Sequence, residues 1–476
     1  MRLAEAARHG SLWQSGKYPP VFPWLLVLPQ AFFGLALMPQ KILVFLFYLA
    51  SAFLLLRRAE RHLPGRWGAP VAWAAMTIPA VLEYGHYVMS EVPYLFFSLV
   101  ALDAAERAAL PAGSGARARS IVLAGLAAAA TFYTRSVGLS LWVAVGAWLL
   151  LSPGPSRRAK SLFAGLSAAL LLPWGLRSIL GPENPYFRQL VLANPFLPEL
   201  GNLDAAGWAG RIGENTRIYL FGEIPTSLLP ILLRSTYAPP ELRYHFLPWF
   251  AAIVPLALLA LGLIAAVRGR EPTGLYVLLY LLLNLLWPSL WTGLRFLVPI
   301  LPLLSLLLFR GLFAVFGILP LPFGMPGRPR RLRPRPRFAA AFLAVWIALA
   351  ARQQVALASE VRRYPPDWDA YFRAAAWLKE HAAAGDTIAD RKPAMLTYVT
   401  GRRAVAFPRE TDPAAMLRWM DREGVDWVVV PAIPYDDISR YLIPAVQAEQ
   451  DRFEPAFEIE EPYTVVLRLL PAREGR

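Results

Sequence analysis

Ten apolar runs, most of them separated by polar loops, dominate this sequence of 476 residues. They lie at about 40–57, 67–84, 92–106, 119–134, 137–152, 161–177, 246–267, 274–290, 294–318 and 338–358. A helix that crosses the roughly 30 Å hydrocarbon core of a bilayer needs about 20 apolar residues, and several runs approach that length. Hydrophobic residues make up 56% of the chain, a larger share than in ordinary soluble domains. The sequence therefore predicts an α-helical polytopic membrane protein with about ten transmembrane helices.

Short basic loops between the runs predict the orientation of the chain in the membrane. They are Arg57–Arg66, Arg107–Arg119, Arg157–Lys160, Arg268–Arg270 and Arg328–Arg337. Lys and Arg concentrate in cytoplasmic loops, and placing all five loops there gives one consistent topology. The outer face then holds 1–39, 84–91, 134–137, 178–245, 290–294 and 359–476. We therefore expect a multi-pass protein of the inner (plasma) membrane.

The net charge of +15 follows from these loops, which would face anionic lipid headgroups. No basic surface with interleaved aromatic residues accompanies them, so membrane lipids rather than nucleic acid are the expected partners.

The apolar segment Val21–Leu37 does not fit the alternation of inside and outside loops. As a span it would place Arg57–Arg66 outside, and Pro23 and Pro29 interrupt it. We interpret it as an interfacial or re-entrant helix on the outer face, and an ordinary span is the alternative.

Two domains are predicted, a transmembrane domain at 1–358 and an extracytoplasmic α/β domain at 359–476. The first includes a long outer loop at 178–245, with short helices of its own, and an irregular Pro/Arg linker at Pro322–Pro336. In the second, helices are expected at Trp368–His381, Pro393–Val399 and Pro413–Glu423. Strands are expected at Asp386–Ala389, Arg403–Phe407, Val425–Val430, Phe453–Ile459 and Thr464–Leu469. Helices and strands of these lengths, in alternation, are typical of a small α/β domain.

The sequence contains no pattern typical of a metal or cofactor site. It has no Cys and five His, and no pair of His has metal-ligand spacing on one helix. No glycine-rich phosphate loop follows an expected strand. We therefore predict neither a metal nor a cofactor.

Glu91 is the candidate catalytic residue. Ser90-Glu91-Val92-Pro93 opens an apolar helix just after an outer loop that contains His86. An ionisable group at such a depth in the membrane is by default functional. The alternative is a helix N-terminal acid that the helix dipole favours, with Ser90 as its N-cap.

Further polar side chains map to the same outer face under this topology. They are Lys17, Tyr18, His86, Arg135, Arg177, Arg243, His245 and Arg295. Guanidinium and ammonium groups pair well with phosphate, so a set of them above a membrane cavity suits a lipid-phosphate ligand. Each one alone is more often an interfacial anchor, and only their shared face favours a binding site.

Six short motifs occur in an order that resembles a known family. They are Lys17-Tyr18-Pro19-Pro20, Ser90-Glu91, Thr134-Arg135-Ser136-Val137-Gly138, Pro173-Trp174-Gly175-Leu176-Arg177, Arg295-Phe296-Leu297-Val298-Pro299 and Thr400-Gly401-Arg402. With the C-terminal α/β domain, they resemble the GT-C integral-membrane glycosyltransferases. The closer resemblance is to bacterial relatives of protein mannosyltransferases and aminoarabinose transferases.

This resemblance implies a polyprenyl-phosphate-linked sugar donor and a lipid, glycan or protein acceptor on the extracytoplasmic face. It also implies that Lys17, Arg135, Arg243 and Arg295 contact the donor phosphate, with Glu91 as an acid or acceptor-orienting group.

The start of the chain departs from the family pattern. Members carry an Asp or Asp-Glu after their first transmembrane helix, and here Glu5 is the only acid before Lys17. We therefore expect the complete protein to have another helix and that acid before Met1. The chain as given is expected to insert poorly or to show little transferase activity.

Two other classes of function remain as alternatives. A polytopic transporter or lipid flippase would also explain many spans and intramembrane charge, although no internal repeat or pair of broken helices is visible. A noncatalytic envelope scaffold that acts through the C-terminal domain is the third possibility. An assay of sugar transfer separates the three.

Overall fold

The chain folds into two units, and the computed structural model describes most residues of both. The described residues are 19–110, 114–180, 185–229, 249–320, 324–325, 328–329, 335–359 and 364–471. The helical unit comprises Met1–Leu192 and Asn202–Ser359, and the C-terminal unit comprises Ala193–Gly201 and Glu360–Arg476.

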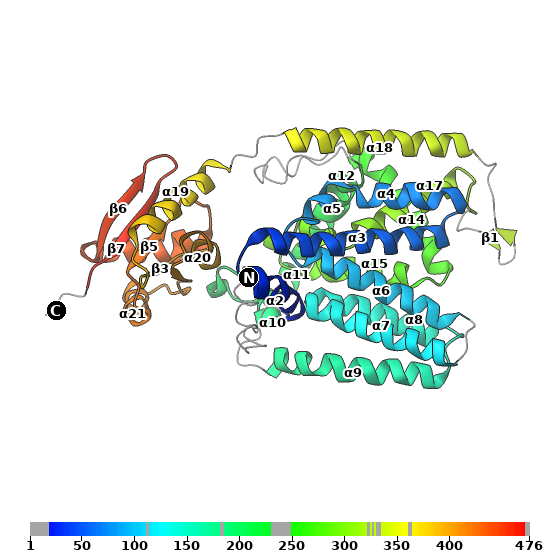
Figure 1. Ribbon diagram of the computed structural model, residues 1–476, viewed down its shortest axis with the longest axis horizontal. Helices are drawn as coiled ribbons and strands as arrows, with labels where there is room; N and C mark the ends of the chain where they lie inside the picture. Colours follow the sequence, from blue (N-terminus) through cyan, green and yellow to red (C-terminus); the bar gives the residue numbers. More distant parts are fainter. Residues whose placement is uncertain are drawn as a thin grey trace. The chain divides into compact units, whose positions relative to one another are not determined.

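Apolar helices of 4 to 26 residues build the helical unit, and most of the longer ones lie roughly parallel to one another (Figure 1). They are α2 (Val21–Phe33), α3 (Leu37–His62), α4 (Gly68–Met76), α5 (Pro79–Tyr84), α6 (Glu91–Ala109), α7 (Ser114–Thr134), α8 (Leu139–Leu151), α9 (Arg157–Leu180), α14 (Trp249–Arg268), α15 (Pro272–Leu286), α16 (Leu294–Leu297), α17 (Leu301–Val315) and α18 (Pro336–Ser359). Each predicted apolar run is helical here. Two of the runs are broken into pairs, α4–α5 and α16–α17, where prolines remove backbone donors.

Three described helices are long and apolar enough to cross a membrane by length and composition, at Leu37–His62, Arg157–Arg177 and Pro336–Val355. Five shorter apolar helices accompany them, so the count of about ten spans remains a prediction. Helix α2 has 13 residues. At 1.5 Å per residue it is about 20 Å long, as is α8 with the same number of residues, so the interfacial position of α2 stays a prediction.

Small residues allow the closest helix contact in the helical unit. A Cβ added at Gly262 of α14 would lie 1.8 Å from the carbonyl oxygen of Leu307, and one at Gly311 of α17 would lie 1.9 Å from that of Leu258. Any side chain at either glycine would push the two helices apart. Close backbone approach at small residues is the usual way in which membrane helices pack.

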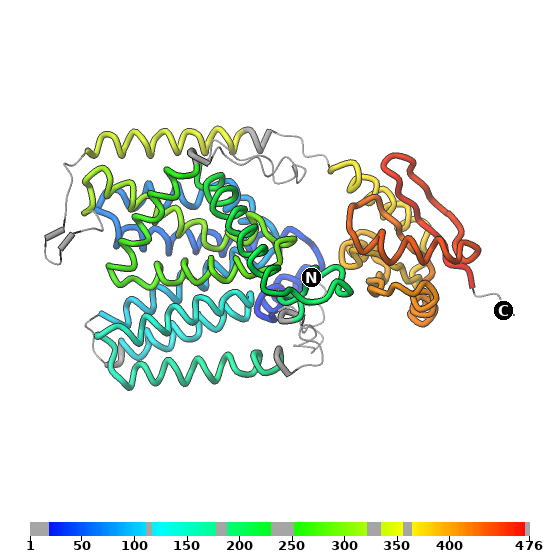
Figure 2. The backbone as a smooth tube through the Cα atoms, turned by 180° about the vertical axis from the view of Figure 1, so that it is seen from behind, coloured from blue at the N-terminus to red at the C-terminus, as the bar shows by residue number. Residues whose placement is uncertain are grey.

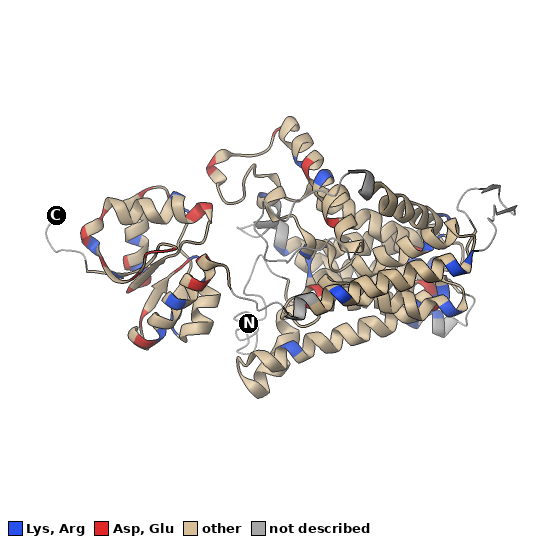
Figure 3. Cartoon of the chain, turned by 90° about the horizontal axis from the view of Figure 1, so that it is seen from above, with Lys and Arg blue, Asp and Glu red and all other residues tan. Residues whose placement is uncertain are grey.

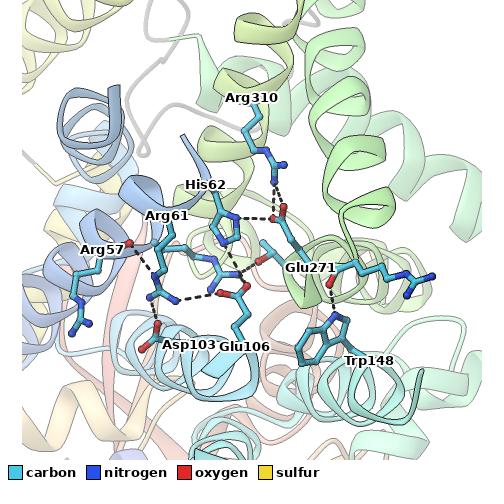
Figure 4. A network of polar contacts seen from close by, with 11 residues as sticks. Arg57, Arg61, His62, Asp103, Glu106, Trp148, Glu271 and Arg310 are labelled. Atoms are coloured by element: carbon cyan, nitrogen blue, oxygen red, sulfur yellow. Dashed lines mark hydrogen bonds and ion pairs between the residues drawn. The ribbon is translucent and has the colours of Figure 1, made fainter. Parts of the chain in front are cut away.

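The charged residues of the helical unit lie mainly toward the helix ends, with long uncharged stretches between them (Figure 3). One end holds a buried ion-pair network that joins three helices, α3, α6 and α15 (Figure 4). Arg58, 1% exposed, pairs with Glu106 at 2.5 Å and donates to Thr273. His62 lies 3.5 Å from Glu106 and 3.3 Å from Glu271.

The same network reaches two further helices. Arg310 of α17 donates to Glu271 at 2.6 Å, and Arg61 of α3 pairs with Asp103 of α6. The Nε1 of Trp148 donates to the carbonyl oxygen of Arg270 at 2.5 Å. The network therefore lies among the loops that the sequence predicts to be cytoplasmic.

Short helices fill the described part of the predicted outer loop. They are α10 (Pro185–Val191), η3 (Pro198–Leu200), α11 (Ala205–Ile218), η4 (Tyr219–Glu223) and α12 (Ile224–Leu228), as expected from the sequence. Asp204 caps α11 by accepting a hydrogen bond from the backbone N–H of Gly207 at 2.7 Å. The predicted irregular linker contains one short ladder, between Gly324–Met325 and Arg328–Pro329, so that prediction was wrong in part.

The C-terminal unit is an α/β domain built on one five-stranded sheet, seen from behind in Figure 2. The strands follow the order β4-β3-β5-β7-β6. Their bounds are β3 (Thr387–Ala389), β4 (Arg403–Val405), β5 (Trp427–Val430), β6 (Phe453–Ile459) and β7 (Thr464–Leu469). Strands β3, β4 and β5 are parallel, and β6 and β7 form an antiparallel hairpin.

Helices cover both faces of this sheet. They are α19 (Pro366–His381), α20 (Pro393–Thr400), α21 (Pro413–Glu423), η6 (Ile438–Leu442) and α22 (Ile443–Ala448). Alternate residues of β5 pack on different faces, because successive side chains of a strand point in opposite directions. Val429 packs with Leu396 of α20, whereas Val428 packs with Met416 of α21.

Candidate functional site

Glu91 lies at the first position of α6, at the opposite end of that helix from Glu106. Its side chain is fully buried, with 0% exposed. Ser90 precedes the helix but makes no side-chain capping hydrogen bond, so the capping role considered for it was wrong. A fully buried carboxylate must be compensated by partners, because burying an isolated charge is very costly.

Two arginines from distant parts of the chain supply that compensation. Arg135, between α7 and α8, donates to Oε1 of Glu91 through Nη1. Arg295 of α16 donates to the same oxygen through Nε at 2.5 Å. Two guanidinium groups on one carboxylate leave the cluster with a net charge of +1.

The two guanidinium groups differ in exposure. The Arg135 side chain is 13% exposed, whereas that of Arg295 is 48% exposed. Arg295 contacts Glu91 through Nε, and its two Nη groups make no hydrogen bond within the described ranges of the chain. Arg295 therefore presents two donors in the fork geometry that suits a phosphate group.

Buried tyrosines support this cluster. The hydroxyl of Tyr280 donates to the carbonyl oxygen of Phe296 at 2.6 Å, which fixes the backbone next to Arg295. The guanidinium of Arg135 lies over the Phe296 ring, 5.5 Å from its centre. Tyr94, one helical turn after Glu91, accepts a hydrogen bond from the hydroxyl of Tyr276 at 3.2 Å. Arg135 and Arg295 are thereby held in defined positions.

Oε2 of Glu91 is the buried polar atom of the cluster that lacks a hydrogen bond to the described residues. A buried unsatisfied oxygen costs about 1–3 kcal/mol. Such an atom is either a local strain or the place where a ligand hydroxyl completes the site.

The remaining predicted site residues differ in whether the structure describes them. Lys17, Tyr18, Arg243 and His245 lie outside the described residues. His86 is exposed, and its ring contacts Tyr87 at a centroid distance of 5.3 Å. The sequence placed Glu91, Arg135 and Arg295 on one face, and the structure brings them into direct contact.

Glu83 and Tyr280 are polar residues near this end of the unit that the sequence analysis missed. Glu83 is 8% exposed and accepts a hydrogen bond from the hydroxyl of Tyr87 at 2.5 Å. The signal for Glu83 was an acid within an otherwise apolar run, as for Glu91. Tyr280 gave no comparable signal, because a tyrosine inside an apolar helix is ordinarily core.

Comparison with known proteins gives a similarity of fold. No protein-family model and no curated protein sequence matches the chain. The structure is similar to that of ArnT from Cupriavidus metallidurans in the apo state, at 14% sequence identity and a TM-score of 0.56, over 98% of this chain and 92% of ArnT. It is also similar to ArnT bound to undecaprenyl phosphate, at 14% identity and a TM-score of 0.54, over 100% and 93% of the two chains. The chain thus shares its fold with these two ArnT structures, in agreement with the mostly helical unit and small sheet that the sequence predicted.

Proposed function

We propose that this protein is a membrane glycosyltransferase that moves a sugar from a polyprenyl-phosphate donor to an acceptor on the extracytoplasmic face. The observation that carries the proposal is the cluster of Glu91, Arg135 and Arg295 in a chain of the GT-C fold. ArnT, which shares the fold, has been crystallised with undecaprenyl phosphate, and that observation favours a lipid-phosphate donor here.

In this proposal Arg295 binds the donor phosphate through its two Nη groups, and the net charge of +1 favours an anionic ligand. As the sugar leaves, the bond between its anomeric carbon and the phosphate oxygen breaks, and the phosphate gains negative charge. Positively charged groups fixed beforehand stabilise such a developing charge most effectively. Arg135 contributes indirectly in this proposal. It holds the carboxylate of Glu91, which in turn orients Arg295.

The geometry favours a positioning role for Glu91 over that of a base exposed to the acceptor. One oxygen is occupied by two guanidinium groups, and the side chain is 0% exposed. We propose that Glu91 holds Arg295 in its binding orientation. The acceptor hydroxyl would reach only Oε2, the oxygen without a partner in the described ranges.

The buried network at the other end of the unit disfavours the transporter alternative. Alternating access requires both ends of a bundle to open in turn. Here contacts of 2.5 to 3.5 Å join the ends of helices α3, α6 and α15. They connect Arg58, Glu106, His62 and Glu271. Separating buried ion pairs of this kind is strongly unfavourable. We infer a site that opens toward one side of the membrane only.

Transfer itself is tested with the full-length protein in proteoliposomes and a polyprenyl-phosphate donor that carries a radiolabelled sugar. We expect release of the label to an acceptor or to water, and we expect Arg295→Gln to reduce the release about 100-fold or more. Absence of release with every donor sugar and acceptor offered would contradict the proposed activity.

The topology can be tested by single-Cys labelling, because the chain has no Cys. Gly213 of α11 and Gly385 of the C-terminal unit are exposed, and Cys at either position should react with an impermeant maleimide in spheroplasts. Pro153, exposed between α8 and α9, should react as Cys only after permeabilisation. Labelling at Pro153 in sealed spheroplasts would place the basic loops outside and remove the basis of the site assignment.

Tyr280→Phe should weaken donor binding more than it slows turnover. The substitution removes the hydrogen bond to the carbonyl of Phe296 and loosens the backbone beside Arg295. We expect a loss of stability of about 1–3 kcal/mol and a higher KM for the donor. Tyr276→Phe is the matched control, because its hydroxyl contacts Ser98 and Tyr94 and not the backbone of Phe296. An equal rise in KM for both variants would show that the effect is one of general stability.

A further inference from the structure

The sheet of the C-terminal unit has a topological switch point between β3 and β5, the kind of place where α/β domains form a crevice for ligands. Strands β3 and β5 are adjacent and parallel. After β3 the chain leads into α20, on the face of the sheet that holds Leu396 and Val429. After β5 it leads into η6 and α22, on the face that holds Leu442 and Val428. Loops that leave neighbouring parallel strands toward opposite faces leave an opening at the carboxyl ends, where α/β domains bind ligands.

The residues that follow the two strands meet across this opening. Arg391, after β3, pairs through Nε with Oδ2 of Asp437, after β5, at 2.5 Å. The guanidinium of Arg391 lies 4.9 Å from the centre of the Tyr435 ring, and the Nζ of Lys392 lies 4.5 Å from the same ring. Cations and one aromatic face thus line the two loops of the crevice.

A segment from a distant part of the chain completes the crevice. Phe196 belongs to Ala193–Gly201, which is part of the C-terminal unit. Its ring centre lies 5.8 Å from the guanidinium of Arg391 and 5.6 Å from that of Arg409, which follows β4. Glu199 anchors the segment by accepting a hydrogen bond from the hydroxyl of Tyr441 at 2.9 Å.

Two buried carboxylates in the crevice have unused oxygens. Oδ1 of Asp390 and Oδ1 of Asp437 are buried and have no hydrogen-bond partner among the described residues. The other oxygen of Asp390 accepts from the Tyr371 hydroxyl at 2.7 Å and from the Lys392 backbone at 2.8 Å. Burial raises the pKa of the Asp390 carboxyl, against the lowering effect of these hydrogen bonds. Each unused oxygen is an acceptor that a ligand hydroxyl could satisfy.

Lys392 adds an unpaired positive charge. Its side chain is half-buried, and no carboxylate lies within ion-pair distance of it in the described ranges of the chain. The aromatic ring of Tyr435 holds the ammonium in place without neutralising it. An ammonium in this position is suited to bind a carboxylate or phosphate.

We propose that this crevice binds a saccharide that carries an acidic group, with sugar hydroxyls donating to Asp437 and the acidic group facing Lys392. The crevice combines hydroxyl acceptors, arginine donors and aromatic faces, which is the combination of groups that a sugar needs. A nucleotide is a poorer fit, because Asp390-Arg391-Lys392 follows β3 where a glycine-rich phosphate loop would stand. The inference does not depend on transfer chemistry at Glu91.

The test uses the full-length protein in lipid nanodiscs, because common detergents contain sugar headgroups. Binding of glucuronate, glucose and acetate is measured by saturation-transfer NMR and calorimetric titration. We expect saturable binding of glucuronate, binding of glucose that is at least about 10-fold weaker, and no saturable binding of acetate. Lys392→Gln should reduce glucuronate binding to the level of glucose, and Lys392→Arg should retain the preference.

Arg373→Gln is the matched control, because Arg373 is an exposed cation of the same unit on α19, away from these loops in sequence. Glu91→Gln should bind glucuronate as the wild type does, which separates this inference from the proposed transfer reaction. The inference is overturned if glucuronate does not bind, if glucose or acetate binds equally well, or if Lys392→Gln binds like Arg373→Gln.

Discussion

Glu91→Gln should lower sugar transfer by about 100-fold, the loss expected when a donor fixed toward the developing negative charge is displaced. The amide keeps the shape of the carboxylate but removes the charge that holds Arg135 and Arg295. Arg295 then loses its fixed orientation toward the donor phosphate. Initial rates of transfer from a labelled polyprenyl-phosphate sugar are the measurement.

The same substitution should also destabilise the protein, which the sequence alone did not suggest. Removing one partner of a buried ion pair costs about 3–5 kcal/mol, because the other charge remains buried. Arg135 is the residue left in that state, since Arg295 is 48% exposed. Thermal unfolding in nanodiscs therefore accompanies each rate measurement, and rates are compared well below the unfolding range.

A double-mutant cycle distinguishes positioning from acid–base work. If Glu91 acts through Arg295, the variant with both Glu91→Gln and Arg295→Gln should be little slower than Glu91→Gln alone. If Glu91 is an independent base, the two losses should multiply. Glu60→Gln, an exposed acid of α3, is the matched control and should retain wild-type rates. Full activity of Glu91→Gln would return the residue to a purely structural role.

Arg58→Met should lower the stability of the helical unit by about 3 kcal/mol, the low end for a broken buried pair. Arg58 is 1% exposed and joins α3 to Glu106 of α6 and Thr273 of α15. The effect falls at the low end because Glu106 keeps contacts with Arg61 and His62, at 3.4 and 3.5 Å. The measurement is the shift of the unfolding midpoint in nanodiscs.

Arg57→Met provides the control at the neighbouring position. Arg57 is exposed, and its guanidinium lies 5.9 Å from the ring centre of Phe53. Loss of an exposed cation–π contact costs about 0.5–1 kcal/mol. Equal shifts for Arg57→Met and Arg58→Met would show that the network contributes little to the stability of the bundle.

The spacing of apolar residues and the positions of Pro and Gly predicted most helices and strands of the C-terminal unit, because these signals depend on residues that are close in sequence. The hairpin at Phe453–Ile459 and Thr464–Leu469 and the helix Pro413–Glu423 have the predicted bounds. Strand β4 ends at Val405 rather than Phe407. The segment η6–α22 was missed although its buried residues Ile438, Tyr441, Leu442 and Ala445 follow helical spacing, because Pro444 interrupts the pattern.

The site was predictable only in part, since it depends on contacts between residues far apart in sequence. Positive-inside topology placed Arg135 and Arg295 on the face of Glu91, but it did not predict that both bind one oxygen of that carboxylate. A separation of 204 residues between Glu91 and Arg295 leaves no local pattern. The buried tyrosines were missed for the same reason, because their hydroxyl partners lie on other helices.

The charge pattern of α6 has a consequence for the biogenesis of the protein. Asp103 and Glu106 pair with arginines of α3, a helix that is synthesised earlier and is already present when α6 leaves the ribosome. Glu91 must wait for Arg135, 44 residues later, and then for Arg295, 204 residues later. Acidic groups without partners are costly in lipid. A nascent chain that ends between α6 and Arg135 therefore holds an acid without its partner, and insertion machinery would have to shield this helix from lipid until Arg135 arrives.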